Sequence, residues 1–92
     1  MSEARQHRFT PPKGATDLLL IRHGETQAAV RGSSFPMVDG QGDPALHPDG
    51  EAQAIAVGER LKAAPISAIY VTKMQRTHQT AAPLAEHLGL TP

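Results

Sequence analysis

The chain has 92 residues, which is enough for one small domain, and it contains no cysteine that could form a disulfide or a thiolate metal site. Nine Lys and Arg residues balance nine Asp and Glu residues, and this zero formal charge argues against a general nucleic-acid binder, which carries a basic excess. Two Phe, one Tyr and no Trp are too few for a base-stacking platform.

The first fourteen residues are polar and end in Pro11-Pro12-Lys13-Gly14, which is typical of a linker. They contain no apolar stretch of the kind found in secretory signals. The longest apolar run, Leu18–Ile21, is far shorter than the roughly 18 residues that span a membrane. We therefore expect a flexible tail over residues 1–14, a folded part over residues 15–92, and a cytoplasmic protein without membrane or nucleic-acid partners.

The folded part is predicted to begin with a strand over Asp17–Arg22, because a short aliphatic run bounded by turn residues suits a strand buried on both faces. Thr26 is expected to cap a short helix through Val30. Gly32–Pro44 is rich in Gly, Pro and Ser and is interpreted as a long loop, and loops of this length are usually functional or disordered.

A helix is predicted over Pro48–Ala64, a second short strand over Ser67–Val71 and a second long helix over Met74–His87. Pro48 suits the first helical position, and Gly89 is a natural stop for the last helix. Pro83 is expected to kink or break that helix. The inner face of the first helix should carry Ala54, Val57, Gly58, Leu61 and Ala64.

Alternation of strands and helices predicts an α/β fold with a parallel sheet. Two strands are fewer than the four to six that sheets usually contain. A parallel pair alone would leave edges open and apolar faces uncovered, so the pattern suggests that further strands belong to the fold.

Basic residues follow both predicted strands, where ligands bind in open α/β sheets. Arg22-His23-Gly24-Glu25-Thr26 follows the first strand, and Arg76-Thr77-His78 follows the second. Two arginines could clamp a phosphate through planar, bidentate hydrogen bonds, and a neutral histidine between them could attack phosphorus. Gly24 would let the backbone approach the substrate closely.

Three blocks of the chain resemble the histidine phosphatase superfamily, the group that includes phosphoglycerate mutase. Leu18–Thr26 resembles the signature of this family, and Met74–Ala81 resembles its third block. The second block is matched by Asp43-Pro44-Ala45-Leu46, Gly50, Gln53-Ala54, Gly58 and Leu61. The resemblance covers about residues 17–90.

The resemblance implies a phosphoglycerate mutase-like, doubly wound and mostly parallel sheet, present here as its N-terminal portion. It implies that His23 accepts the phosphoryl group and that Arg22 and Arg76 bind phosphate oxygens and neutralise their charge. It implies no metal and no cofactor. The substrate-binding set implied is Arg22, Gly24, Glu25, Thr26 and Arg76.

The chain departs from the family pattern in several places. An asparagine common six residues after the nucleophile is Ala29 here, which removes a phosphate donor and weakens a mutase interpretation. The threonine that usually caps the next helix is His47, a poorer cap. The usual Ser-Ser-Pro before the second arginine is Val71-Thr72-Lys73. The acidic proton donor and the second phosphate-binding histidine of the family would lie past Pro92, and so would a strand between the two predicted here.

The function predicted is that of a phosphatase acting on a small phosphate ester through a phosphohistidine, with the 92-residue chain alone expected to be inactive. A mutase-type phosphotransferase and a non-catalytic phosphate- or partner-binding fragment stay open as alternatives. The partners expected are a small phosphorylated substrate and either a second copy of the chain or a complementing C-terminal segment. Substrate identity is left open.

Other polar residues have simpler interpretations. Glu25 adjoins the nucleophile, but an acid at a helix N-terminus is more often electrostatic than catalytic. Asp43 and Asp49 suit turn and first-turn positions, and Glu86 suits a solvated helix face. The spacing of His7, His47, His78 and His87 matches no standard metal-ligand pattern, so surface or local hydrogen-bonding roles are expected, with His78 a candidate to face the pocket.

Overall fold

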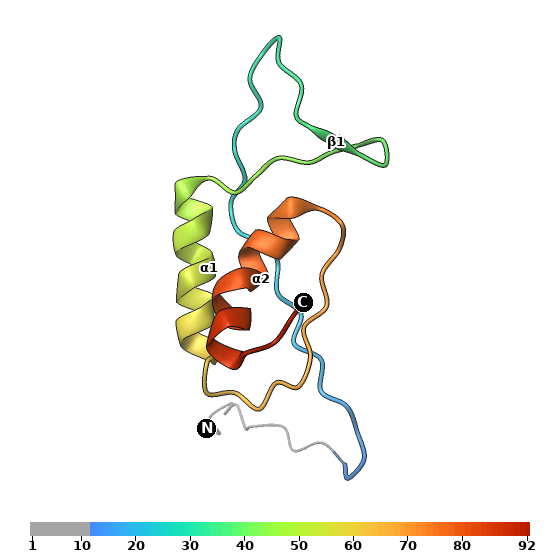
Figure 1. The fold of residues 1–92 in the computed structure, drawn as a ribbon, viewed down its shortest axis with the longest axis vertical. Coiled ribbons are helices and arrows are strands. Elements are labelled where there is room, and N and C mark those ends of the chain that lie inside the picture. The colour runs from blue at the N-terminus through green and yellow to red at the C-terminus, as the bar shows by residue number, and fades with distance from the viewer. Residues whose placement is uncertain (1–11) are drawn as a thin grey trace, which may run out of the picture.

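The structure is a computed structural model that describes residues 12–92, and its main body is a pair of helices packed side by side (Figure 1). The elements are β1 (Met37–Val38), β2 (Gln41–Gly42), α1 (Pro48–Leu61) and α2 (Gln75–Leu88). The β1–β2 hairpin lies beyond one end of the helix pair. The predicted tail over residues 1–14 falls largely on residues 1–11, which lie outside the described part.

Helix α1 begins at Pro48, as predicted, and ends at Leu61, earlier than the predicted Ala64. Two acidic residues, Asp49 and Glu51, lie in the first turn, where the helix dipole favours negative charge. His47 caps the helix with its side chain: its Nδ1 accepts the backbone N–H of Asp49 at 3.0 Å. An imidazole nitrogen thus supplies the acceptor that threonine would otherwise provide.

Helix α2 runs as one element through Pro83, so of the two outcomes predicted there, a kink or a break, the break is wrong. Proline lacks one backbone N–H and needs extra room for its ring. That room exists because Gly58 of α1 lies opposite: a Cβ atom on Gly58 would sit 3.2 Å from Pro83. Gly89 ends the helix with a φ of 67°, a left-handed conformation that glycine adopts without strain.

Small residues line the contact between the two helices. The buried positions of α1 are Gly50, Ala54 and Gly58, spaced four residues apart on one face, and those of α2 are Thr80, Leu84 and Ala85. The predicted inner face of α1 is confirmed at Ala54 and Gly58. Leu46 and Met74, each beside a helix N-terminus, complete the buried core. Close helix approach therefore rests on small side chains rather than on bulky interlocking ones.

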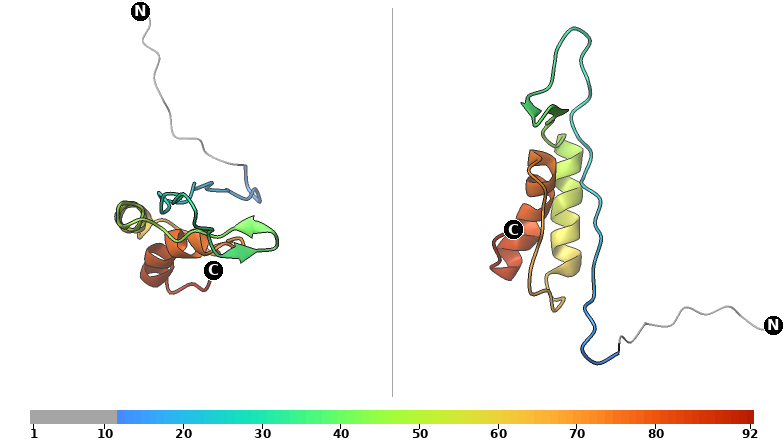
Figure 2. Two further views of the ribbon diagram at one scale, coloured as in Figure 1. Left: turned by 90° about the horizontal axis from the view of Figure 1, so that it is seen from above. Right: turned by 90° about the vertical axis from the view of Figure 1, so that its right-hand side faces the viewer.

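The two predicted strands are extended but unpaired in the described part, so they are not strands (Figure 2). Asp17–Arg22 runs lengthwise beside the helix pair, and Ser67–Val71 lies outside any sheet. A strand exists only through a hydrogen-bonded neighbour about 4.8 Å away, and neither segment has one. The only sheet in residues 12–92 is the antiparallel β1–β2 hairpin. Helices and a two-stranded sheet are consistent with an α/β class.

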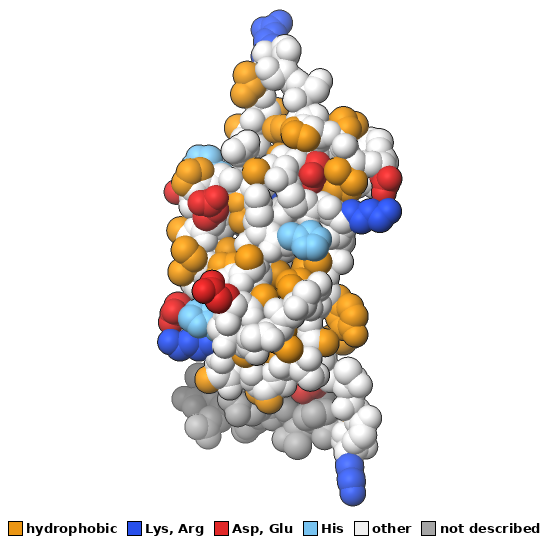
Figure 3. Space-filling view, viewed as in Figure 1, with side chains coloured by type: hydrophobic (Ala, Val, Ile, Leu, Met, Phe, Trp, Pro, Cys, Tyr) orange, Lys and Arg blue, Asp and Glu red, His pale blue; other side chains and the backbone are white. Residues whose placement is uncertain are grey.

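Apolar side chains are left uncovered, as expected for a fold that lacks neighbouring strands. Leu20 and Tyr70 are 93% and 91% exposed, and a groove of about 920 Å³ is lined by both extended segments together with apolar residues of both helices. Figure 3 shows hydrophobic side chains reaching the surface on one face of the molecule.

No helix in residues 12–92 is long and apolar enough to cross a membrane.

The connection from His23 to α1 differs from the prediction in two respects. Thr26 forms an antiparallel bridge with Leu46 rather than capping a helix, because Gln27 N–H donates to Ala45 O at 2.9 Å. The predicted loop over Gly32–Pro44 contains the β1–β2 hairpin, whose two-residue turn is Asp39-Gly40 with φ values of 50° and 76°. Positive φ at both positions is the geometry of a type I′ turn.

Candidate active site

The residues that follow the first extended segment form a loop anchored by one side chain from each helix. Gly24 donates its N–H to Thr80 Oγ1 of α2 at 3.0 Å, and Glu25 donates its N–H to Gln53 Oε1 of α1 at 2.9 Å. The Thr80 hydroxyl itself donates to Arg76 O at 2.7 Å, which leaves its lone pair directed at Gly24. Two successive backbone amides are thereby held by groups far away in the sequence.

Two glycines bring this loop against the start of α1. A Cβ on Gly24 would lie 2.6 Å from Gly50 O, and a Cβ on Gly50 would lie 2.0 Å from Glu25 O. Both distances are too short for real atoms, so any side chain at either position would push the loop away from the helix. Gly24 was predicted to allow close approach of a substrate; the structure gives it a packing role against α1.

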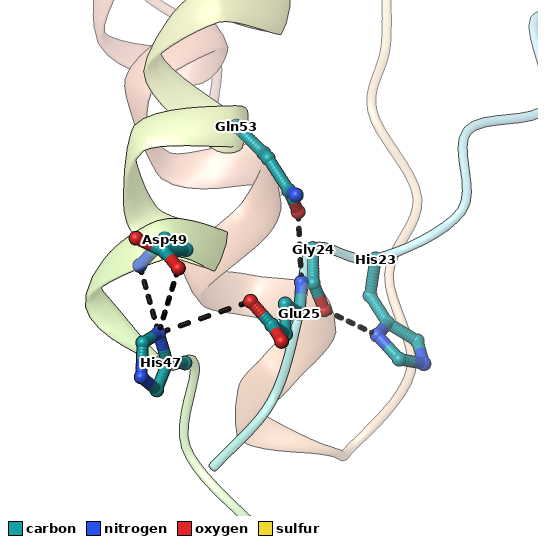
Figure 4. Close-up of polar contacts among 6 residues, drawn as sticks. All are labelled: His23, Gly24, Glu25, His47, Asp49 and Gln53. Atoms are coloured by element: carbon teal, nitrogen blue, oxygen red, sulfur yellow. Dashed lines mark hydrogen bonds and ion pairs between the residues drawn. The ribbon is translucent and has the colours of Figure 1, made fainter.

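The His23 ring is oriented by its own loop. Its Nδ1 lies 2.8 Å from Gly24 O (Figure 4). A carbonyl oxygen can only accept, so Nδ1 carries the proton in this contact and the neutral ring keeps a lone pair on Nε2. The side chain is half-buried. Within residues 12–92, Nε2 has no hydrogen-bond partner, so the ring combines a fixed tautomer with an available lone pair, as a nitrogen nucleophile requires.

A pocket of about 430 Å³ opens beside the ring. Its lining residues are Arg22, His23, Gly24, Glu25, Thr26 and Gln53. Five of these belong to the predicted site. Arg22 is the one positively charged residue among these six, and it is exposed. The pocket therefore brings a cation and a candidate nucleophile to one surface depression.

The second predicted arginine lies outside the lining of this pocket. Arg76, in the first turn of α2, is half-buried, and its Nη1 donates to Gly42 O of β2 at 3.2 Å. Nearby, Lys73 is paired with Asp39 in the hairpin turn at 3.1 Å. Basic groups at the start of α2 thus hold the hairpin in this structure.

Glu25 faces away from the His23 ring and toward the start of α1 (Figure 4). His47 Nδ1 lies 3.8 Å from the Glu25 carboxylate and 3.6 Å from that of Asp49. These three groups lie close enough together for a metal ion. The same Nδ1 lone pair accepts the Asp49 N–H, so a cation there would compete with the cap of α1.

The remaining predicted polar residues have local partners or stand apart. Asp43 is buried and accepts the backbone N–H of Gln75 at 2.7 Å, which holds the start of α2. His87 lies 3.4 Å from Glu59, and His78 is exposed and outside the pocket lining. His7 lies outside the described residues. The local role expected for His47 is confirmed by its cap.

Sequence reasoning missed the roles of Gln53 and Thr80. Both residues lie in blocks that resemble the family, but no local pattern assigns them a partner. Their bonds to the His23 loop span 28 and 56 residues of sequence. Apolar helix spacing does not single out Thr80, and only the packed structure shows which backbone amide its hydroxyl meets.

Comparisons with known proteins place the chain among histidine phosphatase relatives. The family model for the histidine phosphatase superfamily (branch 1) matches residues 18–92. A probable phosphoglycerate mutase GpmB from Klebsiella pneumoniae subsp. pneumoniae is 40% identical over 70 residues, covering 76% of this chain and 31% of that protein. A 2,3-bisphosphoglycerate-dependent phosphoglycerate mutase from Bartonella quintana is 35% identical over 74 residues, covering 78% of this chain and 34% of that protein. No solved structure matches with significance. The chain thus spans about a third of the length of these curated relatives.

Proposed function

Because the chain belongs to the histidine phosphatase superfamily, we propose that it supplies the nucleophilic part of a phosphatase that hydrolyses a small phosphate ester through a phosphohistidine at His23. The observation that carries the proposal is the 2.8 Å contact between His23 Nδ1 and Gly24 O, because it assigns the proton to Nδ1 and the lone pair to Nε2 of a ring that lines one pocket with Arg22. We further propose that residues 15–92 form the N-terminal portion of a doubly wound, mostly parallel domain.

In the first step, the Nε2 lone pair attacks phosphorus, a P–N bond forms, and the P–O bond to the alcohol breaks. The proton stays on Nδ1 and remains hydrogen-bonded to Gly24 O, and this hydrogen bond stabilises the positive charge that develops on the ring. Arg22 in the pocket, and Arg76 if its guanidinium leaves Gly42 O, would neutralise the phosphoryl oxygens. In the second step, water attacks phosphorus, the P–N bond breaks, and inorganic phosphate leaves.

A proton must reach the leaving alcohol oxygen, and none of the acidic residues near the ring is well placed for this. Glu25 is the only carboxylate in the pocket lining, and it faces His47. We therefore expect phosphate binding and phosphoryl acceptance by the 92-residue chain more readily than turnover of an ester.

The proposal can be tested with phosphoramidate, whose leaving nitrogen already carries its proton. The P–N bond of the reagent breaks, ammonia leaves and phosphorus bonds to the histidine, so the test requires no acid from the protein. We expect labelled phosphate that is stable to alkali and labile to acid. His23→Ala should abolish the label, whereas His78→Ala, at an exposed position outside the pocket, should keep it. Label that survives His23→Ala unchanged would refute the proposal.

A mutase-type phosphotransferase is the second candidate, and the names of the relatives favour it. The reaction would share the phosphohistidine but return the phosphoryl group to a second hydroxyl instead of water. Stimulation of isomerase activity by a bisphosphorylated cofactor would identify this reaction. Release of inorganic phosphate without such stimulation would identify the phosphatase. A non-catalytic binding piece would bind phosphate and show neither.

A further inference from the structure

The peptide group between Gly24 and Glu25 connects the His23 ring to helix α1. Its C=O accepts from His23 Nδ1 at 2.8 Å, and its N–H donates to Gln53 Oε1 at 2.9 Å. Because a peptide is planar and trans, the C=O and N–H point in opposite directions along one rigid unit. The direction of the N–H therefore fixes the direction of the C=O.

This peptide needs an external support. Gly24 has no Cβ, so no side chain of its own restricts the backbone rotation that turns the following peptide plane. The Thr80 bond holds the preceding peptide through Gly24 N–H and does not fix the next one. On the far side, His47 N–H donates to Glu25 O at 2.9 Å, which fixes the peptide after Glu25. Among these contacts, the Gln53 bond alone fixes the peptide that contacts the ring.

We propose that Gln53 is a positioning residue for the nucleophile, holding the Gly24–Glu25 peptide so that His23 keeps its proton on Nδ1 and its lone pair on Nε2. The chain of contacts runs from Gln53 Oε1 through one peptide to the imidazole (Figure 4). An acceptor on the N–H also polarises the C=O at the other end of the same peptide and strengthens its bond to Nδ1. The inference deepens the proposed function, because it concerns how that same histidine is prepared.

Gln53 also lines the pocket, so a direct contact with bound phosphate is the competing role. The two roles predict different results in the unliganded protein. A phosphate contact has no effect on the ring before phosphate binds, whereas a positioning role changes the tautomer of the free ring.

The experiment is ¹⁵N NMR of the histidine ring nitrogens in unliganded protein at about pH 8.5, above the ordinary titration range of histidine. The two neutral tautomers give widely separated ring-nitrogen shifts, and the averaged shifts report their ratio. In the parent protein we expect the Nδ1–H form of His23 to dominate. Gln53→Met keeps helix propensity and side-chain length but removes the acceptor, and we expect it to move the ratio toward the Nε2–H form by about threefold to tenfold, the range of one hydrogen bond.

Two further variants make the test specific. Gln53→Glu keeps an acceptor oxygen, and its spectrum should retain the parent ratio. Gln79→Met is the matched control, because Gln79 Oε1 also accepts a backbone N–H, that of Leu46 at 2.8 Å, and not the N–H of the Gly24–Glu25 peptide. It should also leave the His23 ratio unchanged.

An unchanged ratio in Gln53→Met overturns the inference, and so does an equal shift in Gln79→Met or Gln53→Glu. The readout involves no phosphate, so it stands apart from the proposed function. If His23 accepts no label from phosphoramidate while the tautomer still depends on Gln53, the proposed function fails and the positioning role survives.

Discussion

At the scale of single residues, the site depends on side chains that serve the backbone of the His23 loop. Thr80 is buried, and its hydroxyl both accepts from Gly24 N–H and donates to Arg76 O. A buried amide that loses its acceptor keeps its desolvation cost without compensation. Thr80 is therefore expected to stabilise the fold as well as the site.

Thr80→Val should lower the free energy of unfolding by about 1–3 kcal/mol, since the isosteric side chain leaves the Gly24 amide unsatisfied. Thr80→Ser keeps the hydroxyl and loses only a methyl group, so its cost should be clearly smaller. Urea titrations followed by circular dichroism measure both. Equal losses for Val and Ser would mean that packing, and not the hydrogen bond, explains the role of Thr80.

The sequence predicts the site residues that are neighbours along the chain and misses those that come from distant segments. Arg22, His23 and Gly24 are consecutive, so a motif brings them together without knowledge of the fold, and the pocket contains all three. Gln53 and Thr80 reach the same loop from two different helices. Pairings of this kind are set by helix packing, which no short pattern encodes.

At the scale of elements, the helices were predictable because their signals are local. Pro48 marks the start of α1 and Gly89 the end of α2, and apolar spacing covers the residues between. The two expected strands could not be predicted in this way, because an extended segment becomes a strand only beside a hydrogen-bonded partner. The hairpin has one local signal, the dipeptide Asp39-Gly40, but the short runs on either side of it lack the alternation that marks paired strands.

A charged cluster near the far end of the helix pair gives a pH prediction. Glu59 is hydrogen-bonded to Lys62 at 2.8 Å and lies 3.4 Å from His87 of α2. The hydrogen bond and charge of Lys62 come first among the causes that hold the pKa of Glu59 below its ordinary value, and His87 adds to them. A carboxyl whose folded pKa is lowered contributes stability above its unfolded pKa and loses it as pH falls through the folded value.

Stability should therefore fall as pH drops below the ordinary carboxylate range, and Lys62→Met should weaken the part of this fall that Glu59 carries. The pair is exposed, so the effect should be small and should shrink further at high salt. Melting temperatures of parent and variant across acidic pH, at low and high salt, measure it. A variant that follows the parent curve at low salt would contradict this account.

At the scale of the whole molecule, the helix pair leaves one side uncovered. The groove between the extended segments is lined by apolar residues of α1 and α2, and Leu18 and Leu20 are 79% and 93% exposed. Unpaired backbone beside exposed apolar side chains favours pairing with other chains. We expect the 92-residue chain to be marginally stable and to self-associate.

Leu20→Lys should reduce self-association because it places a charge on the exposed segment, and it should leave the helix content unchanged because Leu20 packs against little. Ala54→Lys is the contrasting control, since Ala54 is buried between the helices and its replacement should disrupt them. Sedimentation velocity and circular dichroism read the two effects separately. Unchanged association in Leu20→Lys would show that this segment is not the contact surface.

The proposed chemistry depends on which nitrogen of which histidine receives the phosphoryl group. Protein with ¹⁵N-labelled histidines, phosphorylated by phosphoramidate and kept alkaline, can be examined by ³¹P NMR for coupling between phosphorus and a single ring nitrogen. The contact between His23 Nδ1 and Gly24 O predicts one P–N bond, at Nε2 of His23. Phosphorus on Nδ1 of His23, or on another histidine, would contradict it.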